Sequence, residues 1–259
     1  MNEFIKAGSR IYTRPNGVDY ALESGTTYTL KFDSWEGTMF LELSNNLELP
    51  KNYFCGPSDK KFIGRILDYF NTTTKNTTGV MLKGLKGSGK SITAKKIALD
   101  SHMPIIVVDP GFPARKLNEF FNKFKQNVCV LFDELEKNEK NWDTDQLLTF
   151  LDGISCTCRK LVIFTCNSDD NVCDFIKDRC SRVRYSRTFD ALSEDAVFGL
   201  CNRELEDEGE ARAACKFIMN TFKTISYDNV LSFVEEIKLD QNATYEELIK
   251  DLNIYKNES

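Results

Sequence analysis

The first group of residues that could carry out chemistry is a glycine-rich stretch, residues 84–91, with the sequence GLKGSGKS. It matches the pattern G-x-x-x-x-G-K-[ST] and lies between an apolar run and a helical segment. Glycines let the backbone wrap around phosphate oxygens, and N–H groups at a helix start point at the anion. We predict that the nucleotide contacts are Gly84, Leu85, Lys86, Gly87, Ser88, Gly89, Lys90, Ser91 and Ile92.

Two residues of this glycine-rich loop have specific expected roles. Lys90 is expected to bridge the β- and γ-phosphates, and the hydroxyl of Ser91 to bind Mg²⁺. ATP is favoured over GTP because no guanine-reading [NT]-K-x-D motif follows in the sequence. The alternative interpretation is a flexible surface turn rich in glycine, serine and lysine.

The second group is an acidic pair, Asp133 and Glu134, directly after the apolar run 128–132. Ligands of parallel α/β sheets gather at the carboxyl ends of the strands. Asp133 is therefore expected to hold Mg²⁺ through water, and Glu134 to act as the general base on the attacking water. The alternative is that both carboxylates only cap the next helix.

The elements that must position these residues follow from the hydrophobic pattern. Apolar and polar residues alternate in residues 1–50, which predicts a small β-rich element. Five apolar runs separated by helical segments then predict an α/β fold, a P-loop parallel five-stranded sheet with helices on both faces. These runs are 80–82, 104–108, 128–132, 161–164 and 183–185. The predicted domains are the β-rich element 1–50, an ATP-binding core 51–190 and a helical lid 191–259.

Composition limits the class of protein. The chain has 259 residues with 34 basic and 39 acidic side chains, a net charge of −5 that argues against bulk electrostatic binding to nucleic acid. Nine cysteines without a CxxC pair indicate a reducing compartment. No apolar run approaches the length of a membrane helix, and residues 1–10 lack a signal-peptide core. We expect a cytoplasmic protein, in a cell or in an infected host, and no membrane partner.

Together with two further segments, these motifs resemble the AAA+ family, specifically its AAA branch. Residues 145–153 (DQLLTFLDG) look like a segment typical of that branch, and residues 161–167 (LVIFTCN) resemble its sensor-1 strand. The resemblance implies that Asn167 helps to position the lytic water. The compact layout of the motifs also looks like that of ATPases from large tailed phages.

The resemblance further implies shared active sites in a homo-oligomer, a hexamer or a partial ring. Arg179 and Arg182 stand where the family carries arginine fingers that enter the neighbouring subunit's site. Cys180 and Ser181 replace the Pro-Gly of that motif. The sensor-2 place in the lid holds residues 227–229 (YDN) instead of an arginine.

The partner is expected to be a macromolecule, a protein in the first place. Phe112 lies where relatives that thread polypeptides carry a gripping aromatic, but a buried anchor for the next helix is an equal alternative. Trp35 is expected to be a packing residue. Two other functions stay open: a nucleotide-gated assembly scaffold with slow hydrolysis, and a DNA-acting loader or helicase accessory that uses the basic residues Arg115, Lys116, Lys123 and Lys125.

Overall fold

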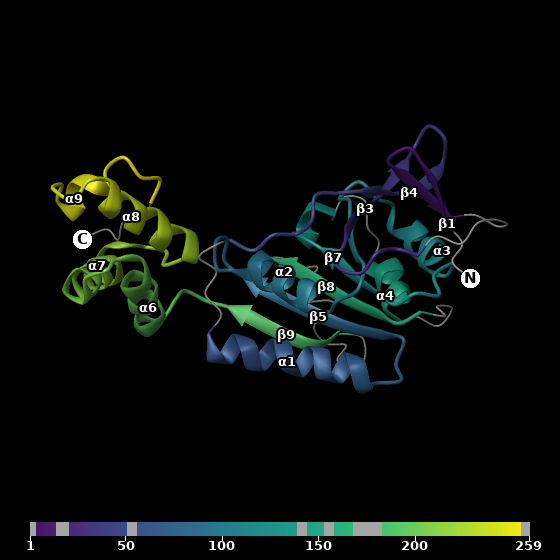
Figure 1. Cartoon of the computed structure of the whole chain (residues 1–259), viewed down its shortest axis with the longest axis horizontal. Coiled ribbons are helices and arrows are strands. Elements are labelled where there is room, and N and C mark those ends of the chain that lie inside the picture. The colour runs from purple at the N-terminus through teal and green to yellow at the C-terminus, as the bar shows by residue number, and fades with distance from the viewer. Residues whose placement is uncertain are drawn as a thin grey trace. The chain divides into compact units, whose positions relative to one another are not determined.

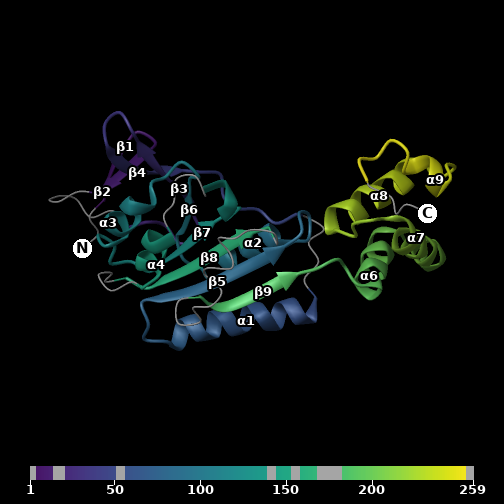
Figure 2. The same cartoon turned by 180° about the vertical axis from the view of Figure 1, so that it is seen from behind.

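The structure is a computed structural model that describes residues 4–13, 21–50, 56–138, 144–152, 158–167 and 183–254. Figures 1 and 2 show its helices and strands from two opposite sides. The chain divides into two compact units. The first unit is Met1–Lys83 with Ser91–Thr188, and the second is Gly84–Lys90 with Phe189–Ser259. Most of the glycine-rich loop therefore groups with the C-terminal helices.

The first unit is built on one mixed sheet. Within the described residues, its strand order is β1-β2-β4-β3-β6-β7-β8-β5-β9. The strands are β1 (Phe4–Ala7), β2 (Arg10–Thr13), β3 (Thr27–Asp33), β4 (Thr38–Leu43), β5 (Thr77–Gly84), β6 (Ile105–Val108), β7 (Val128–Phe132), β8 (Lys160–Cys166) and β9 (Val183–Phe189). The pairs β5–β8, β8–β7 and β7–β6 are parallel. The predicted α/β class is confirmed, and the five predicted apolar runs lie in β5 to β9.

The N-terminal strands continue this sheet. β1, β2 and β4 pair antiparallel, as do β4 and β3. β3 then pairs parallel with β6, in a register that places Leu30 beside Val108. An unpaired strand edge exposes a row of N–H and C=O groups, and β3 satisfies those of β6. The side-chain amide of Gln126 also accepts a hydrogen bond from the N–H of Leu22 and donates one to its carbonyl oxygen, which links this N-terminal segment to the core. The division into three domains remains a prediction.

Aromatic side chains fill the core beside the sheet. The rings of Phe132 and Phe164, on neighbouring strands, stack with centroids 4.9 Å apart. Phe121 and Phe150 come from the helical segments that cover them. The helices of this unit are α1 (Pro57–Thr72), α2 (Lys90–Asp100), η1 (Ala114–Lys116), α3 (Leu117–Phe121), η2 (Leu135–Asn138) and α4 (Thr144–Asp152).

Helix α1 runs alongside β9, as both views show (Figures 1 and 2). Tyr185 of β9 makes edge-on ring contacts with Phe62 and Tyr69 of α1. Its hydroxyl donates a hydrogen bond to the carbonyl of Arg65 at 3.0 Å. Among the described residues, no helix combines the length and the apolar character needed to cross a membrane.

The second unit consists of helices and residues of the glycine-rich loop. Its helices are α6 (Glu194–Glu204), α7 (Glu208–Thr221), α8 (Tyr227–Leu239) and α9 (Tyr245–Leu248). Each begins after a side-chain cap that accepts a hydrogen bond from the backbone three residues on. The caps are Ser193, Asp207, Ser226 and Thr244. Buried residues such as Val197, Ile218 and Phe233 form the apolar interior of this unit.

Several buried cysteines behave as small apolar residues. Cys129, Cys158, Cys201 and Cys215 are free thiols. Burial raises the pKa of both Cys129 and Cys201 to about 12, so these thiols stay protonated at neutral pH. Protonated thiols are poor nucleophiles and poor metal ligands. A packing role therefore suits Cys129 and Cys201.

Truncating Leu30 tests whether β3 is an integral part of the core. The side chain is fully buried between Leu41 of β4 and Val108 of β6. Leu30→Ala is expected to lower the free energy of unfolding by about 2–5 kcal/mol, because it leaves a cavity. Urea unfolding followed by circular dichroism measures the change. Leu43→Ala, at a position that is half exposed, is the control and should change it by less than about 0.5 kcal/mol. An equally small effect of Leu30→Ala would contradict the integration of β3.

Candidate active site

The glycine-rich loop has the backbone of an anion-binding loop. Gly87 and Gly89 have φ angles of +71° and +94°, which side chains with a Cβ rarely adopt. A Cβ on Gly89 would meet no atom within 4 Å, so this glycine borders open space. The hydroxyl of Ser88 is buried and lacks a hydrogen-bond partner among the described residues. An unused buried donor beside an open glycine fits a phosphate oxygen as its partner.

Lys90 lies folded back over this loop. Its side chain is 6 % exposed, and its Nζ donates to the carbonyl oxygens of Gly84 and Leu85 at 2.8 and 2.6 Å. A buried ammonium requires such acceptors. The amine is therefore held against the backbone of the loop that is expected to bind phosphates.

Three polar side chains meet at one carboxylate oxygen at the ends of β7 and β8. The hydroxyl of Ser91 donates to Oδ1 of Asp133 at 2.9 Å, and the hydroxyl of Thr165 donates to the same atom at 2.6 Å. The register of Phe132 with Phe164 places Asp133 and Thr165 next to one another. Ser91 and Asp133, the two residues predicted for Mg²⁺, are thus brought together. Hydroxyl and carboxylate oxygens are the donors that Mg²⁺ prefers, so the residues present fit this ion.

Glu134 occupies a strained backbone position next to this cluster. Its φ angle is +52°, which is uncommon for a residue other than glycine. Its backbone N–H donates to the hydroxyl of Thr165 at 2.8 Å, which helps to stabilise this conformation. The carboxylate of Glu134 forms an ion pair with Lys137. This hydrogen-bonded pairing raises the pKa of Lys137. To take a proton from water, Glu134 has to exchange this partner.

Asn167 is also held by a neighbour in the structure. It follows β8, and its amide nitrogen donates to Oε1 of Glu136 in η2. Glu136 and Lys137 belong to the same short 3₁₀ helix directly after the acidic pair. Both predicted catalytic side chains of this region, Glu134 and Asn167, therefore have partners in η2.

Sequence reasoning missed the parts played by Thr165, Glu136 and Lys137. Thr165 had a signal, because a hydroxyl next to an apolar run in a fully buried strand needs a partner. Glu136 and Lys137 had none, since charged residues after a strand usually form a solvated surface. The predicted fingers Arg179 and Arg182 lie outside the described residues.

The structure shows which of the two aromatic side chains, Phe112 and Trp35, is buried and which is exposed. Phe112 is fully buried, and its ring packs edge-on against Phe32 with centroids 6.4 Å apart. Phe112 is therefore the buried anchor and not a projecting aromatic side chain. Burial of the ring favours this arrangement by about 2–3 kcal/mol. The expectation that Trp35 packs was wrong, since its side chain is 96 % exposed. Trp35 lies in the turn between β3 and β4, where its backbone N–H donates a hydrogen bond to the carboxylate of Asp33.

Comparison with known families identifies part of the chain. Residues 80–188, which run from β5 to β9, match the family described as "ATPase family associated with various cellular activities (AAA)". This region is thus similar to an AAA ATPase domain. The domain contains the glycine-rich loop, the acidic pair and Asn167.

Two individual proteins also have sequences similar to part of this chain. Residues of the chain are 28 % identical over 142 positions to ATP-dependent zinc metalloprotease FtsH 3 of Phytoplasma mali (strain AT), covering 43 % of this chain and 24 % of that protein. FtsH 2 of the same organism is 28 % identical over 116 positions, covering 36 % and 17 %. The chain thus spans a quarter or less of the length of these relatives. The AAA domain and these ATP-dependent relatives indicate that the chain hydrolyses ATP.

A solved structure supports the fold. A RuvB mutant of Thermotoga maritima superposes with a TM-score of 0.54 and 14 % identity, covering 77 % of this chain and 71 % of that one. At this identity the similarity concerns the fold alone. It agrees with an α/β core followed by helices.

Replacing Thr165 tests the hydrogen-bonded cluster at Asp133. Thr165→Val keeps the shape of the side chain but removes the bonds to Asp133 and to the N–H of Glu134. Unsatisfied buried polar groups cost about 1–3 kcal/mol, so kcat for ATP is expected to fall about tenfold or more. Thr165→Ser keeps the hydroxyl and should retain most of the activity. Steady-state hydrolysis and thermal melting are measured together, and a folded Thr165→Val protein with unchanged kcat would contradict this role.

Proposed function

We propose that this chain is a Mg²⁺-dependent ATPase that works as a homo-oligomer and uses hydrolysis to remodel or translocate a macromolecular partner. One observation carries the proposal. The hydroxyl of Ser91 donates to Asp133, the first of the two acidic residues after β7. Since Ser91 directly follows the loop lysine in α2, the residues proposed for phosphate and for metal are consecutive in one helix.

The proposed roles follow from the chemistry of each group. Lys90 and the amides of residues 84–92 bind the phosphates, and Ser91 and Asp133 hold Mg²⁺. The metal ion, when bound, neutralises charge that develops on the phosphate oxygens. Glu134 accepts the proton of the attacking water, and Asn167 orients that water.

The remaining roles belong to a neighbouring copy. Arg179 and Arg182 of one subunit complete the site of the next and stabilise the transferring phosphoryl group. A guanidinium supplied in this way contributes several orders of magnitude to the rate. The proposed oligomer is a hexamer or a partial ring, and an isolated subunit would then be nearly inactive.

A protein is the proposed partner. The two curated relatives are described as ATP-dependent zinc metalloproteases, and each is 28 % identical to this chain over the matched positions. Proteolysis itself is not part of the proposal, because the sequence has one histidine and the H-E-x-x-H zinc motif needs two. The layout of the motifs, which resembles that of ATPases of large tailed phages, motivates the further proposal of a phage-encoded protein that acts in the host cytoplasm.

Mixing two inactive variants tests the shared site. Glu134→Gln lacks the general base, and Arg179→Ala lacks the finger, so each alone is expected to lose at least about 99 % of the activity. A site that combines Glu134 of one copy with Arg179 of its neighbour is intact. Equal amounts, mixed as dilute subunits before assembly with ATP, should recover about a quarter of the wild-type rate, because random assembly restores one interface in four.

The same preparation separates the alternatives. Full activity of a wild-type sample that is monomeric by light scattering, or no recovery in mixed oligomers, would rule out shared sites. Wild-type turnover slower than about one per minute, with ATP-dependent assembly and no stimulation by any protein, would instead favour a scaffold. Stimulation by DNA that is lost at raised salt would favour the DNA-acting alternative.

A further inference from the structure

Helix α8 is hydrogen-bonded directly to the glycine-rich loop. Within the second unit, the carbonyl oxygen of Gly87 accepts from the backbone N–H groups of Tyr227 at 2.9 Å and Asp228 at 3.4 Å. These are the first two residues of α8, whose cap is Ser226. Gly87 stands in the middle of the loop. The start of α8 is therefore bonded to the same stretch of backbone that is proposed to bind phosphate.

The side chain of Asp228 lies against the loop glycine. A Cβ on Gly87 would stand 3.0 Å from Oδ2 and 3.3 Å from Cγ of Asp228. The carboxylate is thus close to the backbone at the centre of the loop. This places a negative group beside a loop whose N–H groups and Lys90 are suited to a polyanion.

The charge of Asp228 has no compensating partner among the described residues. Within the part of the chain that the structure describes, no ion pair or side-chain hydrogen bond involves its carboxylate. Partial loss of solvent raises the pKa of this carboxyl group, because desolvation disfavours the charged form. Asp228 is nevertheless exposed to solvent. Its field is therefore screened in part but still acts on the loop.

We infer that Asp228 sets the nucleotide affinity, because its carboxylate opposes the negative charge of phosphates bound in the glycine-rich loop. The inference rests on the proposed nucleotide site. Like charges separated by a few ångströms to about 10 Å repel, and the backbone bonds from Tyr227 and Asp228 to Gly87 keep Asp228 beside the loop. ADP and ATP consequently bind more weakly and dissociate faster than the loop alone would allow. Faster product release favours turnover, since release often limits kcat.

A structural role makes a different prediction. A carboxylate in the first turn of a helix stabilises that helix by interaction with the helix dipole. If this were the only role of Asp228, its removal would lower the stability of the second unit and would not tighten nucleotide binding. The two roles are thus separable by measuring affinity and stability on the same variants.

The experiment compares variants that differ in one charge. ADP and ATP are titrated calorimetrically into the full chain, and dissociation of a fluorescent ADP analogue is followed by stopped flow. Asp228→Asn is expected to bind ADP about three- to tenfold tighter and to release it correspondingly slower. Asp228→Ser is a second neutral variant in case the asparagine disturbs the helix start. Asp228→Glu keeps the charge and should remain close to the wild type.

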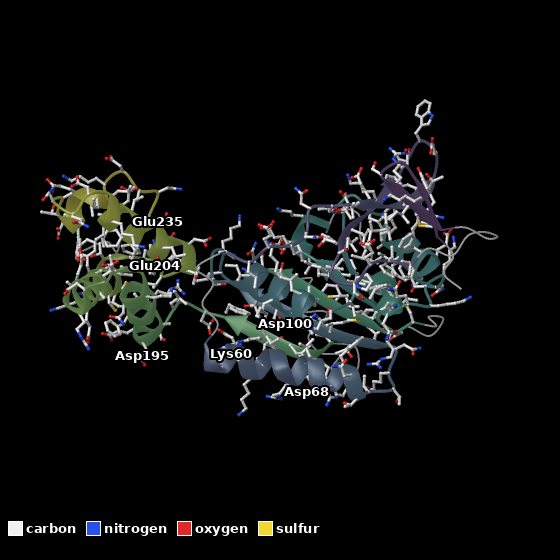
Figure 3. All side chains as sticks on the ribbon, viewed as in Figure 1. Lys60, Asp68, Asp100, Asp195, Glu204 and Glu235 are labelled. Carbon is white, nitrogen blue, oxygen red and sulfur yellow. The ribbon has the colours of Figure 1, made fainter. Side chains whose placement is uncertain are left out.

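The matched control is Glu235→Gln, which removes one charge from the same helix. Glu235 is exposed on α8 and is labelled in Figure 3. The affinity of the Glu235→Gln variant for ADP should stay within about twofold of the wild type, because a distant, solvated charge is screened. Thermal melting of all variants checks that the second unit is folded.

The outcomes distinguish this inference from the proposed function. Folded Asp228→Asn and Asp228→Ser proteins that bind ADP as weakly as the wild type, or more weakly, would overturn the role of Asp228. A wild-type protein that binds neither ADP nor ATP, or a Lys90→Ala variant that binds them equally well, would instead overturn the nucleotide site itself. Tighter binding by both neutral variants and by neither Asp228→Glu nor Glu235→Gln is the expected result.

Discussion

Two hydrogen bonds to one carboxylate oxygen of Asp133 hold the candidate site together. Ser91 donates from the start of α2 and Thr165 from β8, while Asp133 directly follows β7. The three residues are far apart in the sequence and meet only because β8 lies between β5 and β7 in the sheet. Hydrogen bonds to a charged group contribute about 1.5–3 kcal/mol each. The strand order and the cluster at Asp133 therefore stabilise one another.

Thr165 links this cluster to the proposed general base. Its hydroxyl donates to Asp133 and accepts from the N–H of Glu134, whose left-handed backbone costs about 1–3 kcal/mol. The side chain of Glu134 is meanwhile paired with Lys137, and Asn167 is bonded to Glu136. The oxygens proposed to bind the metal ion are thus already together, while the groups proposed to activate water have partners in η2. In the proposed reaction cycle, these groups exchange their internal partners for the attacking water.

Local sequence patterns predicted the glycine-rich loop and the core strands, because both depend on residues that are close in the sequence. The spacing of Gly84, Lys90 and Ser91 defines the loop, and the apolar runs define the strands of the core. The pairing of β3 with β6 was not predictable, because alternation shows which side of a strand is buried but not which strand lies next to it. The same limit applied to Phe112, whose partner Phe32 is eighty residues away in the chain.

Contacts between distant segments also explain what the sequence left out of the site. Thr165, Glu136 and Lys137 became part of it only through the register of β7 with β8 and the turn of η2. The contact of Asp228 with Gly87 joins residues more than a hundred positions apart. The catalytic roles of Lys90, Glu134 and Asn167 stay predictions, as do those of Arg179 and Arg182 outside the described residues.

The most direct measurement is the effect of Mg²⁺ on ATP affinity in the wild type and in Asp133→Asn, each titrated calorimetrically with and without MgCl₂. If Ser91 and Asp133 hold a magnesium-bound triphosphate, Mg²⁺ tightens ATP binding to the wild type. The substitution should then weaken this enhancement about tenfold or more and leave metal-free ATP binding unchanged. An Asp133→Asn protein with the full wild-type enhancement would contradict the central claim.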